Sequence, residues 1–132
     1  MKCLDTSFLV DLLRNDEGAI RKAKELDEKG PSATTEINVF ELTYGIHRSK
    51  HTNRRLRVEQ VGRLFSRLIT LPLNHDAALR AGEALGKLTR EGKEASTLDG
   101  LVTSIAIAHG CDAIVTRNVK HFVMLGIRVE TY

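Results

Sequence analysis

The sequence of 132 residues predicts a single α/β domain, in which a short parallel sheet of four or five strands lies between two layers of helices. Two observations predict this three-layer α/β/α fold. Apolar segments of about four residues alternate with helical segments, and strands that are connected by helices pair in parallel. The chain has only two prolines and no repeat or linker, so we expect residues 1–132 to form one domain.

The first half of the chain shows this alternation through its helix breaks. The pair Asn15-Asp16 interrupts the first helical segment, and Gly30-Pro31 ends the charged helix that follows. Apolar residues at positions 37, 40, 42 and 46 lie on the next helix. The expected elements are a strand at 2–4, helices at 6–14 and 17–29, a strand at 32–35 and a helix at 36–49.

The second half shows a clearer periodicity. Apolar residues at 61, 64, 65, 68 and 69 recur at the spacing of an amphipathic helix, which we expect over 53–69. A similar apolar stripe over 98–108 ends at His109-Gly110, and an Ala/Leu-rich helix ends near Gly92. The expected elements are a helix at 53–69, a strand at 69–73, helices at 76–90 and 96–108, a strand at 113–116, a short helix at 119–125 and a strand at 127–130.

Positive charge is concentrated in one segment. Residues 42–67 contain seven basic residues and one acid, a net charge of +6, whereas the whole chain carries +3. Such a patch suits a polyanion or an acidic protein partner, although a solvated helix face has the same composition. Only two aromatic residues fall in the segment, so it does not indicate base stacking. The candidate binding residues are Arg48, Lys50, Arg54, Arg55 and Arg57.

Three carboxylates are expected at the carboxyl edge of the sheet, where parallel sheets bind their ligands. Asp5 directly follows the first strand, Glu41 lies in the helix after the second strand, and Asp99 lies in the first turn of a later helix. Thr116-Arg117-Asn118 follows the fourth strand. Each acid also has a local explanation: Asp5 can cap a helix, Ser96 and Asp99 fit a capping box, and Glu41 can be a solvated helix residue.

Grouped carboxylates constrain the chemistry of such a site. They repel one another, and a divalent cation removes that cost. Oxygen ligands favour Mg²⁺ or Mn²⁺ over Zn²⁺, and either ion can activate water for attack on a phosphodiester. Neither GxGxxG nor GxxxxGK[ST] occurs in the chain, so the use of a nucleoside triphosphate is not indicated.

Four segments match, in order and over essentially the whole chain, the motifs of a known family. They are LDTS at 4–7, VFELTYG at 39–45, TLDGLVTSIAIAHG at 97–110 and IVTRNVKHF at 114–122. Each motif alone is weak, but the ordered set is fairly specific. The chain therefore resembles the PIN-domain ribonucleases, and most closely the VapC-type toxins of toxin–antitoxin pairs.

The resemblance implies a type II toxin that cleaves RNA with Mg²⁺ or Mn²⁺, forms a homodimer and is blocked by an antitoxin that wraps around it. Asp5, Glu41 and Asp99 would be the catalytic, metal-binding acids, supported by Ser7, Thr116 and Asn118. A groove for the apolar face of an amphipathic partner helix is also indicated by the apolar residues of helices 36–49 and 53–69, because they exceed what one side of a small core needs. They are Ile37, Phe40, Leu56, Val61, Leu64 and Phe65.

The chain departs from the family pattern at two places. Thr97 stands where the family often has a further Asp, and Asn118 and His121 stand where another acid is common. Asn118 can hold a metal-bound water but supplies no charge. The site would carry a formal charge of −3 in place of −4, so we expect a weaker affinity for the metal.

Two other hypotheses remain open. A PIN-like domain without activity could bind RNA or protein through residues 42–67, and only the nuclease hypothesis makes the three acids essential. A receiver-like domain or phosphohydrolase could use Asp5 as phosphoacceptor, but receivers place the acceptor after a central strand, where this chain has Leu71-Pro72-Leu73-Asn74.

The sequence also bears on location. Its apolar runs fall far short of the roughly 20 residues that cross a bilayer, so we expect no membrane association. The N-terminal segment carries Asp5 and Asp11 and does not resemble a signal peptide. Cys3 and Cys111 are too far apart in the sequence for a CxxC motif, and we expect buried thiols in a cytoplasmic protein.

Overall fold

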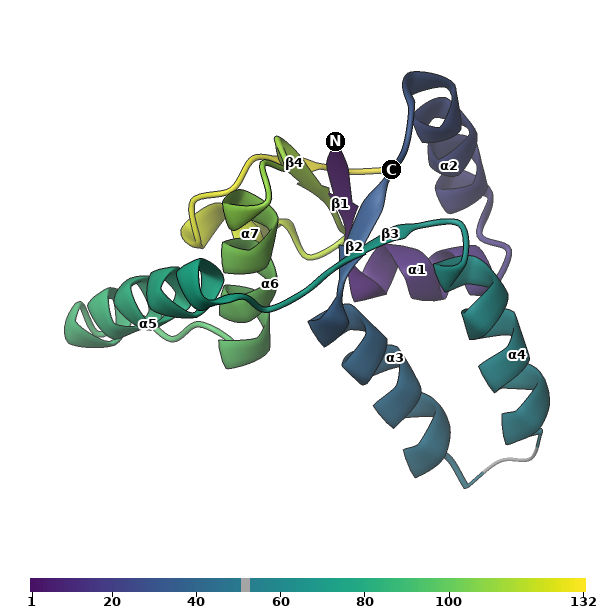
Figure 1. Ribbon diagram of the computed structural model, residues 1–132, viewed down its shortest axis with the longest axis horizontal. Helices are drawn as coiled ribbons and strands as arrows, with labels where there is room; N and C mark the ends of the chain where they lie inside the picture. The colour runs from purple at the N-terminus through teal and green to yellow at the C-terminus, as the bar shows by residue number, and fades with distance from the viewer. Residues whose placement is uncertain (51–52) are drawn as a thin grey trace.

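The computed structural model describes residues 1–50 and 53–132 and confirms the α/β fold with a five-stranded parallel sheet (Figure 1). The strand order is β3-β2-β1-β4-β5, so the chain builds outward from β1 on one side and then returns to β1 with β4. All four strand pairings are parallel. The strands are β1 (Lys2–Leu4), β2 (Ala33–Thr35), β3 (Ile69–Leu71), β4 (Ala113–Val115) and β5 (Val129–Glu130).

Helices connect these strands and cover both faces of the sheet. They are α1 (Thr6–Leu13), α2 (Glu17–Lys29), α3 (Glu36–Arg48), α4 (Arg54–Phe65), α5 (His75–Arg90), α6 (Thr97–Ala108) and α7 (Val119–Met124). Figure 1 shows α3 and α4 extending together away from the carboxyl ends of the strands. No helix in the described part of the chain has the length and apolar character needed to cross a bilayer.

Alternate residues of the strands supply two separate cores. On one face, Cys3 of β1 and Ile114 of β4 are buried together with residues of α5, α6 and α7. On the other face, Leu4 and Val115 are buried with residues of α1, α2, α3 and α4. Because successive side chains of a strand point to opposite faces, strands of three residues are enough to support both layers.

The helix expected over residues 53–69 is shorter than its apolar periodicity predicts. α4 ends at Phe65, and the backbone N–H groups of residues 66–68 form turn hydrogen bonds to the end of the helix. The N–H of Ile69 donates to the carbonyl of Ser32 at 3.0 Å, which begins the pairing of β3 with β2. Pairing with the sheet therefore overrides the helical pattern.

The order of the strands also bears on the receiver-like hypothesis. The expectation that the strand before Pro72 is central is wrong, because this strand is β3, which lies at the edge of the sheet. The central strand is β1, and Asp5 follows it directly. Topology therefore does not exclude Asp5 as a phosphoacceptor, and the surroundings of its carboxylate must decide.

A cluster of charged side chains joins β1, α2 and β5. Glu130 pairs with Lys2 at 2.7 Å and with Lys22 at 2.9 Å, and all three side chains are no more than 20% exposed. The hydrogen bonds from Lys2 and Lys22 lower the pKa of Glu130 to about 2. The cluster thus fixes the last strand against the first.

We predict that Glu130→Gln lowers the free energy of unfolding by roughly 2 kcal/mol at pH 7, because it weakens hydrogen bonds to two charged groups. The lowered pKa stabilises the fold above the ordinary value of 4.5, and this contribution is lost as the pH falls towards 2. Urea unfolding should show the largest difference from wild type at pH 7. An equal loss at pH 2.5, or an equal loss in the exposed control Glu28→Gln, would contradict a charge-based role.

Candidate active site

The carboxyl ends of β1 and β4 meet at the point where the strand order reverses, which is where open α/β sheets bind their ligands. Asp5 follows β1 and Thr116 follows β4. The Thr116 hydroxyl donates a hydrogen bond of 2.7 Å to Oδ2 of Asp5, across 111 residues of sequence. The two strand ends therefore form one polar site.

Asp5 is buried, with 3% of its surface exposed, and its carboxylate is held by three side chains. Oδ2 accepts from Thr116 and from Ser7 at 3.1 Å, and Oδ1 lies 3.4 Å from the Asn38 amide nitrogen. Although Asp5 is the residue before α1, its side chain makes no cap hydrogen bond. The interpretation of Asp5 as only a helix cap is wrong, because the carboxylate is directed to the polar site instead.

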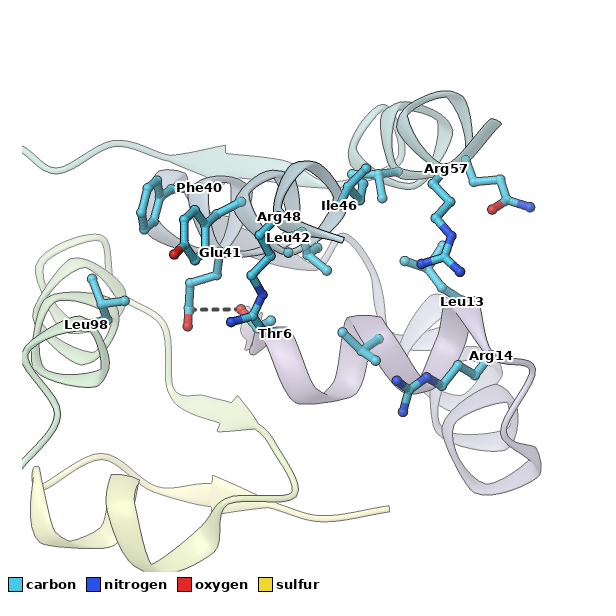
Figure 2. Close-up of a pocket in the computed structure, with 15 residues that line it drawn as sticks. Thr6, Leu13, Arg14, Phe40, Glu41, Leu42, Ile46, Arg48, Arg57 and Leu98 are labelled. Carbon is cyan, nitrogen blue, oxygen red and sulfur yellow. Dashed lines mark hydrogen bonds between the residues drawn. The ribbon is translucent and has the colours of Figure 1, made fainter. Parts of the chain in front are cut away.

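Glu41 lies next to this group on α3. Its Oε1 accepts a hydrogen bond of 2.9 Å from the Thr6 hydroxyl (Figure 2). Thr6 in turn accepts a hydrogen bond of 2.9 Å from the Asn38 amide. Glu41 is half-buried, so the interpretation as a solvated helix residue is also wrong. Thr6 and Asn38 connect it to Asp5.

Asn38 is a site residue that sequence reasoning missed. It is fully buried, and its Oδ1 accepts from the backbone N–H and the hydroxyl of Thr35 in a capping box at the start of α3. Its Nδ2 faces Thr6 and Asp5. The spacing Thr35-x-x-Asn38 before an apolar helix was the available signal, because Asn can replace the usual Glu or Gln of the box.

Asp99 reaches the site from the start of α6. The Ser96 hydroxyl accepts from the backbone N–H of Asp99 at 3.3 Å, so Ser96 caps the helix as expected. The Asp99 carboxylate is not part of that cap, and its Oδ2 lies 3.3 Å from Nδ1 of His121. The half-buried carboxylate is thus available at the edge of the sheet.

The three acids are near enough to act on one another electrostatically. Burial raises the pKa of Glu41, and the charges of Asp5 and Asp99 raise it further against the hydrogen bond from Thr6. Burial also raises the pKa of Asp99, and Asp5 adds to this rise while His121 opposes it. The structure therefore brings Asp5, Glu41 and Asp99 into one field of negative charge.

A divalent cation would relieve this repulsion, and carboxylate oxygens are the ligands that Mg²⁺ and Mn²⁺ prefer. As they stand, no three His, Cys, Asp or Glu side chains within residues 1–50 and 53–132 form a cluster that could hold a metal ion. The chemistry of the donors fits a divalent ion, and coordination by all three acids would require side-chain adjustment.

Of the other polar residues expected at the site, Ser7 and Thr116 are buried in it, whereas Asn118 and Thr97 are exposed. Ser7 accepts from the backbone N–H of Arg117, and Thr116 accepts from that of Asn118 at 3.0 Å, so both hydroxyls also fix the loop after β4. Asn118 is exposed and its side chain makes no cap bond with α7. Thr97 is exposed at the first position of α6.

A second set of residues that sequence reasoning missed supports this loop from behind. Asp11 is buried on α1 and accepts hydrogen bonds from Arg117 at 3.1 Å and from the Tyr132 hydroxyl at 2.6 Å. Burial and this hydrogen bond raise the pKa of Tyr132. The contacts anchor residue 132 and the loop after β4 to the helix that carries Ser7.

A hollow of about 850 Å³ lies beside the acids, between α1, α3 and α4, and reaches α6 at Leu98 (Figure 2). Glu41 and Thr6 line it together with three arginines, Arg14, Arg48 and Arg57. Its other lining residues are mainly apolar or aromatic: Val10, Leu13, Phe40, Leu42, Tyr44, Gly45, Ile46, Gln60 and Val61.

This hollow matches the expected groove only in part. Phe40 and Val61, two of the apolar residues on which the expected groove was based, line the hollow. Leu56 is exposed to solvent and does not line it. Ile37, Leu64 and Phe65 pack against the two cores instead.

Only part of the basic segment 42–67 lies beside the hollow. All five of its selected side chains are exposed, but only Arg48 and Arg57 share the hollow with Glu41. Arg54 donates to the carbonyl of Ser49, and Arg55 lies 3.6 Å from Glu59. Positions 51 and 52 of the segment lie outside the described residues.

The PIN domain family matches residues 2–123 of this chain. The chain is 27% identical over 130 residues to the tRNA(fMet)-specific endonuclease VapC of Shigella flexneri, covering 98% of this chain and 96% of that protein. It is 28% identical over 125 residues to Ribonuclease VapC19 of Mycobacterium tuberculosis, covering 94% of each.

Solved structures of VapBC proteins are similar to this chain in fold. DNA-bound VapBC from Salmonella typhimurium has a TM-score of 0.85 at 27% identity and covers 98% of this chain and 96% of that chain. VapBC2 from Rickettsia felis, bound to a promoter DNA fragment, matches with a TM-score of 0.88 at 23% identity, over 99% of this chain and 98% of that chain. This similarity shows that the two proteins share a fold.

We predict that Glu41→Gln raises the melting temperature of the metal-free protein at pH 7.5. The substitution removes a half-buried charge that Asp5 and Asp99 repel. Because the pKa of Glu41 is raised in the fold, its ionisation costs no stability below the ordinary value of 4.5. The cost grows as the pH rises from 4.5 to the raised value and is constant above it. We expect a rise of roughly 2–4 °C, which about 1 kcal/mol produces in a domain of this size.

Calorimetry in the presence of a chelator measures this effect, and the difference from wild type should vanish near pH 4. The exposed acid Glu94 provides the matched control Glu94→Gln, which should leave the melting temperature unchanged at both pH values. An unchanged or lower melting temperature of Glu41→Gln at pH 7.5 would show that the three acids do not repel one another measurably.

Proposed function

The chain belongs to the PIN domain family, and on this premise we propose that it is a metal-dependent endoribonuclease that acts as the toxin of a type II toxin–antitoxin pair. The observation that carries the proposal is the buried carboxylate of Asp5 at the switch point of the parallel sheet, with Glu41 connected to it through Thr6 and Asn38 and with Asp99 near enough to feel its charge. The endonuclease and ribonuclease relatives, and the toxin–antitoxin complexes with the same fold, support it.

Asp5, Glu41 and Asp99 would hold the cation, which we expect to be Mg²⁺ or Mn²⁺. When bound, the ion would supply an activated water and stabilise the charge that develops on the attacked phosphate. RNA is the class of substrate proposed for this chain, whereas the tRNA(fMet) specificity belongs to the named relative from Shigella flexneri.

Neighbouring side chains hold each of the three carboxylates in position. Ser7 and Thr116 occupy Oδ2 of Asp5, so Oδ1, whose contact with Asn38 is long, is the oxygen more available to a cation. Thr6 holds one oxygen of Glu41, and His121 lies beside Asp99. These contacts reduce the freedom of the acids before any ligand binds, which is what a preorganised site requires.

Arginines in the adjacent hollow would bring the substrate to this negative site. Arg48 and Arg57 line the same hollow as Glu41 and can neutralise RNA phosphates, which steers a polyanion towards the acids. The remaining basic residues, Lys50, Arg54 and Arg55, would contribute to the wider positive surface.

A cognate antitoxin is the proposed protein partner. An apolar helix of the antitoxin could lie between α3 and α4, where Ile46 and Val61 line the hollow. A basic residue that follows this helix could then pair with Asp5, Glu41 and Asp99 and displace the cation. We further propose a homodimer in the cytoplasm, on the family resemblance.

The Asp5→Asn variant should lose RNA cleavage by at least about a hundredfold while retaining the fold, because the change is nearly isosteric but removes a charge from the metal ligands. Cleavage of an end-labelled RNA on a denaturing gel, with Mg²⁺ or Mn²⁺ and with a chelator, measures this. Wild-type cleavage should require the cation and stop with the chelator.

The exposed acid Asp27 gives the matched control, since Asp27→Asn removes one charge from α2 and should cleave like wild type. Wild-type-like cleavage by purified Asp5→Asn would contradict the mechanism. RNA binding without cleavage by the wild-type protein would support the alternative of an inactive binding domain. Transfer of phosphate to Asp5 from a small phosphodonor would support the receiver-like alternative, which its burial and three contacts disfavour.

A further inference from the structure

Three side chains form a stacked row along α3, beginning beside the acid site. The rings of Phe40 and Tyr44 lie 5.7 Å apart with an angle of 18° between their planes. The guanidinium of Arg48 lies over the Tyr44 ring, 5.5 Å from its centre. We call Phe40, Tyr44 and Arg48 the stacking row.

Burial does not explain this row. Phe40 is 53% exposed and Tyr44 is 56% exposed, so each residue leaves about half of its surface in water. Stacking between residues four apart stabilises a helix only slightly, by less than the cost of exposing two aromatic rings. Two exposed rings beside a charged site are the type of feature that marks a ligand surface.

The row also has a defined position relative to the chemistry. Glu41 is adjacent to Phe40 on α3, and both residues line the hollow together with Tyr44 and Arg48 (Figure 2). Eight residues of α-helix separate Phe40 from Arg48, a rise of about 12 Å. A stacked nucleic-acid strand advances about 3.4 Å per nucleotide, so the row is long enough for about three nucleotides.

The row extends beyond the basic segment considered in the sequence analysis. Residues 42–67 contain too few aromatics to indicate base stacking, but Phe40 lies just outside that window and the helix places it against Tyr44. The spacing of the row, at i, i+4 and i+8, was the signal that a count of residues within a window did not detect.

We propose that the stacking row binds unpaired bases of the RNA substrate next to the cleavage site. This inference rests on the proposed ribonuclease function and adds which side chains hold the bases. Bases stack on exposed aromatic rings regardless of sequence, and a guanidinium can stack on a base or pair with a phosphate. Arg14 and Arg57 line the same hollow and would neutralise neighbouring phosphates.

The charges favour RNA over a protein helix as the occupant of this row. An apolar helix needs aliphatic side chains around it, and the hollow supplies these outside the row, at Leu13, Ile46 and Val61. The row instead combines rings with a guanidinium, which is the combination that single-strand binding proteins use.

The first test compares affinities for a fluorescein-labelled single-stranded RNA, measured by anisotropy in the presence of a chelator. The double variant F40L/Y44L keeps apolar side chains but removes both rings, and it should lower the affinity by about tenfold or more. The affinity of wild type should fall by a similar factor for an abasic ribose-phosphate strand of the same length, whereas Tyr44→Phe should bind RNA like wild type.

Salt dependence separates the rings from the charges. F40L/Y44L should leave the slope of log affinity against log salt unchanged, because both variant side chains are uncharged and every arginine remains. Replacing Arg54, Arg55 and Arg57 together by Gln should flatten the slope by about 0.7 for each phosphate that is no longer neutralised. An altered slope in F40L/Y44L would overturn a stacking role.

A fluorescent variant keeps the proposal testable if the double variant does not fold. The chain contains no tryptophan, so Phe40→Trp introduces a single indole probe in the row. Single-stranded RNA should quench its fluorescence and the abasic strand should not. Equal quenching by both strands would overturn the proposal.

The outcomes distinguish this inference from the proposed function. If wild type cleaves RNA with Mg²⁺ and F40L/Y44L binds RNA equally well, the row does not bind bases and belongs to a protein interface, while the nuclease function stands. If wild type neither binds nor cleaves RNA, both proposals fail. About tenfold weaker binding with an unchanged slope supports the stacking role.

Discussion

The hydrogen bond from Thr116 to the buried carboxylate of Asp5 is the contact on which the site depends. It joins the ends of β1 and β4, which are neighbours in the sheet, across 111 residues of sequence. A buried carboxylate is tolerated only when its oxygens have partners, and these partners come from α1, α3 and the loop after β4. The carboxylate therefore fixes the relative positions of the elements that surround it.

The same arrangement creates an electrostatic cost. Burial and then the charge of Asp5 raise the pKa values of Glu41 and Asp99, and no ion pair to Asp5 or Glu41 occurs in the described part of the chain. The fold accepts this repulsion although the structure elsewhere pairs its partly buried acids, as Glu130 with Lys2 and Lys22. Asp5 and Glu41, which have no basic partner among the described residues, lie with Asp99 at a ligand-binding edge, and this arrangement is typical of a site kept for a cation.

Most helices and strands could be predicted from the sequence because their limits depend on residues that are close together in the chain. Breaks at Asn15-Asp16 and Gly30-Pro31 and the spacing of apolar residues located the helices, and the alternation of elements indicated a parallel sheet. The end of α4 was misplaced because pairing of Ile69 with Ser32 depends on a strand that is distant in the sequence. Asn38 and Asp11 were missed for a related reason, since their partners lie on other elements. The position of Asp5 could be predicted because a parallel sheet gathers the residues that follow its strands at one edge, and the shared site of Asp5, Glu41 and Asp99 stays a prediction.

Anomalous diffraction from crystals of the wild-type protein grown with Mn²⁺ would examine the shared cation site itself, because it locates the ion without reference to activity. We expect a manganese peak at the switch point, with carboxylate oxygens of Asp5 and of Glu41 or Asp99 at about 2.0–2.6 Å. A manganese site elsewhere, or carboxylates of this trio separated by more than about 10 Å in the loaded protein, would contradict a shared cation site.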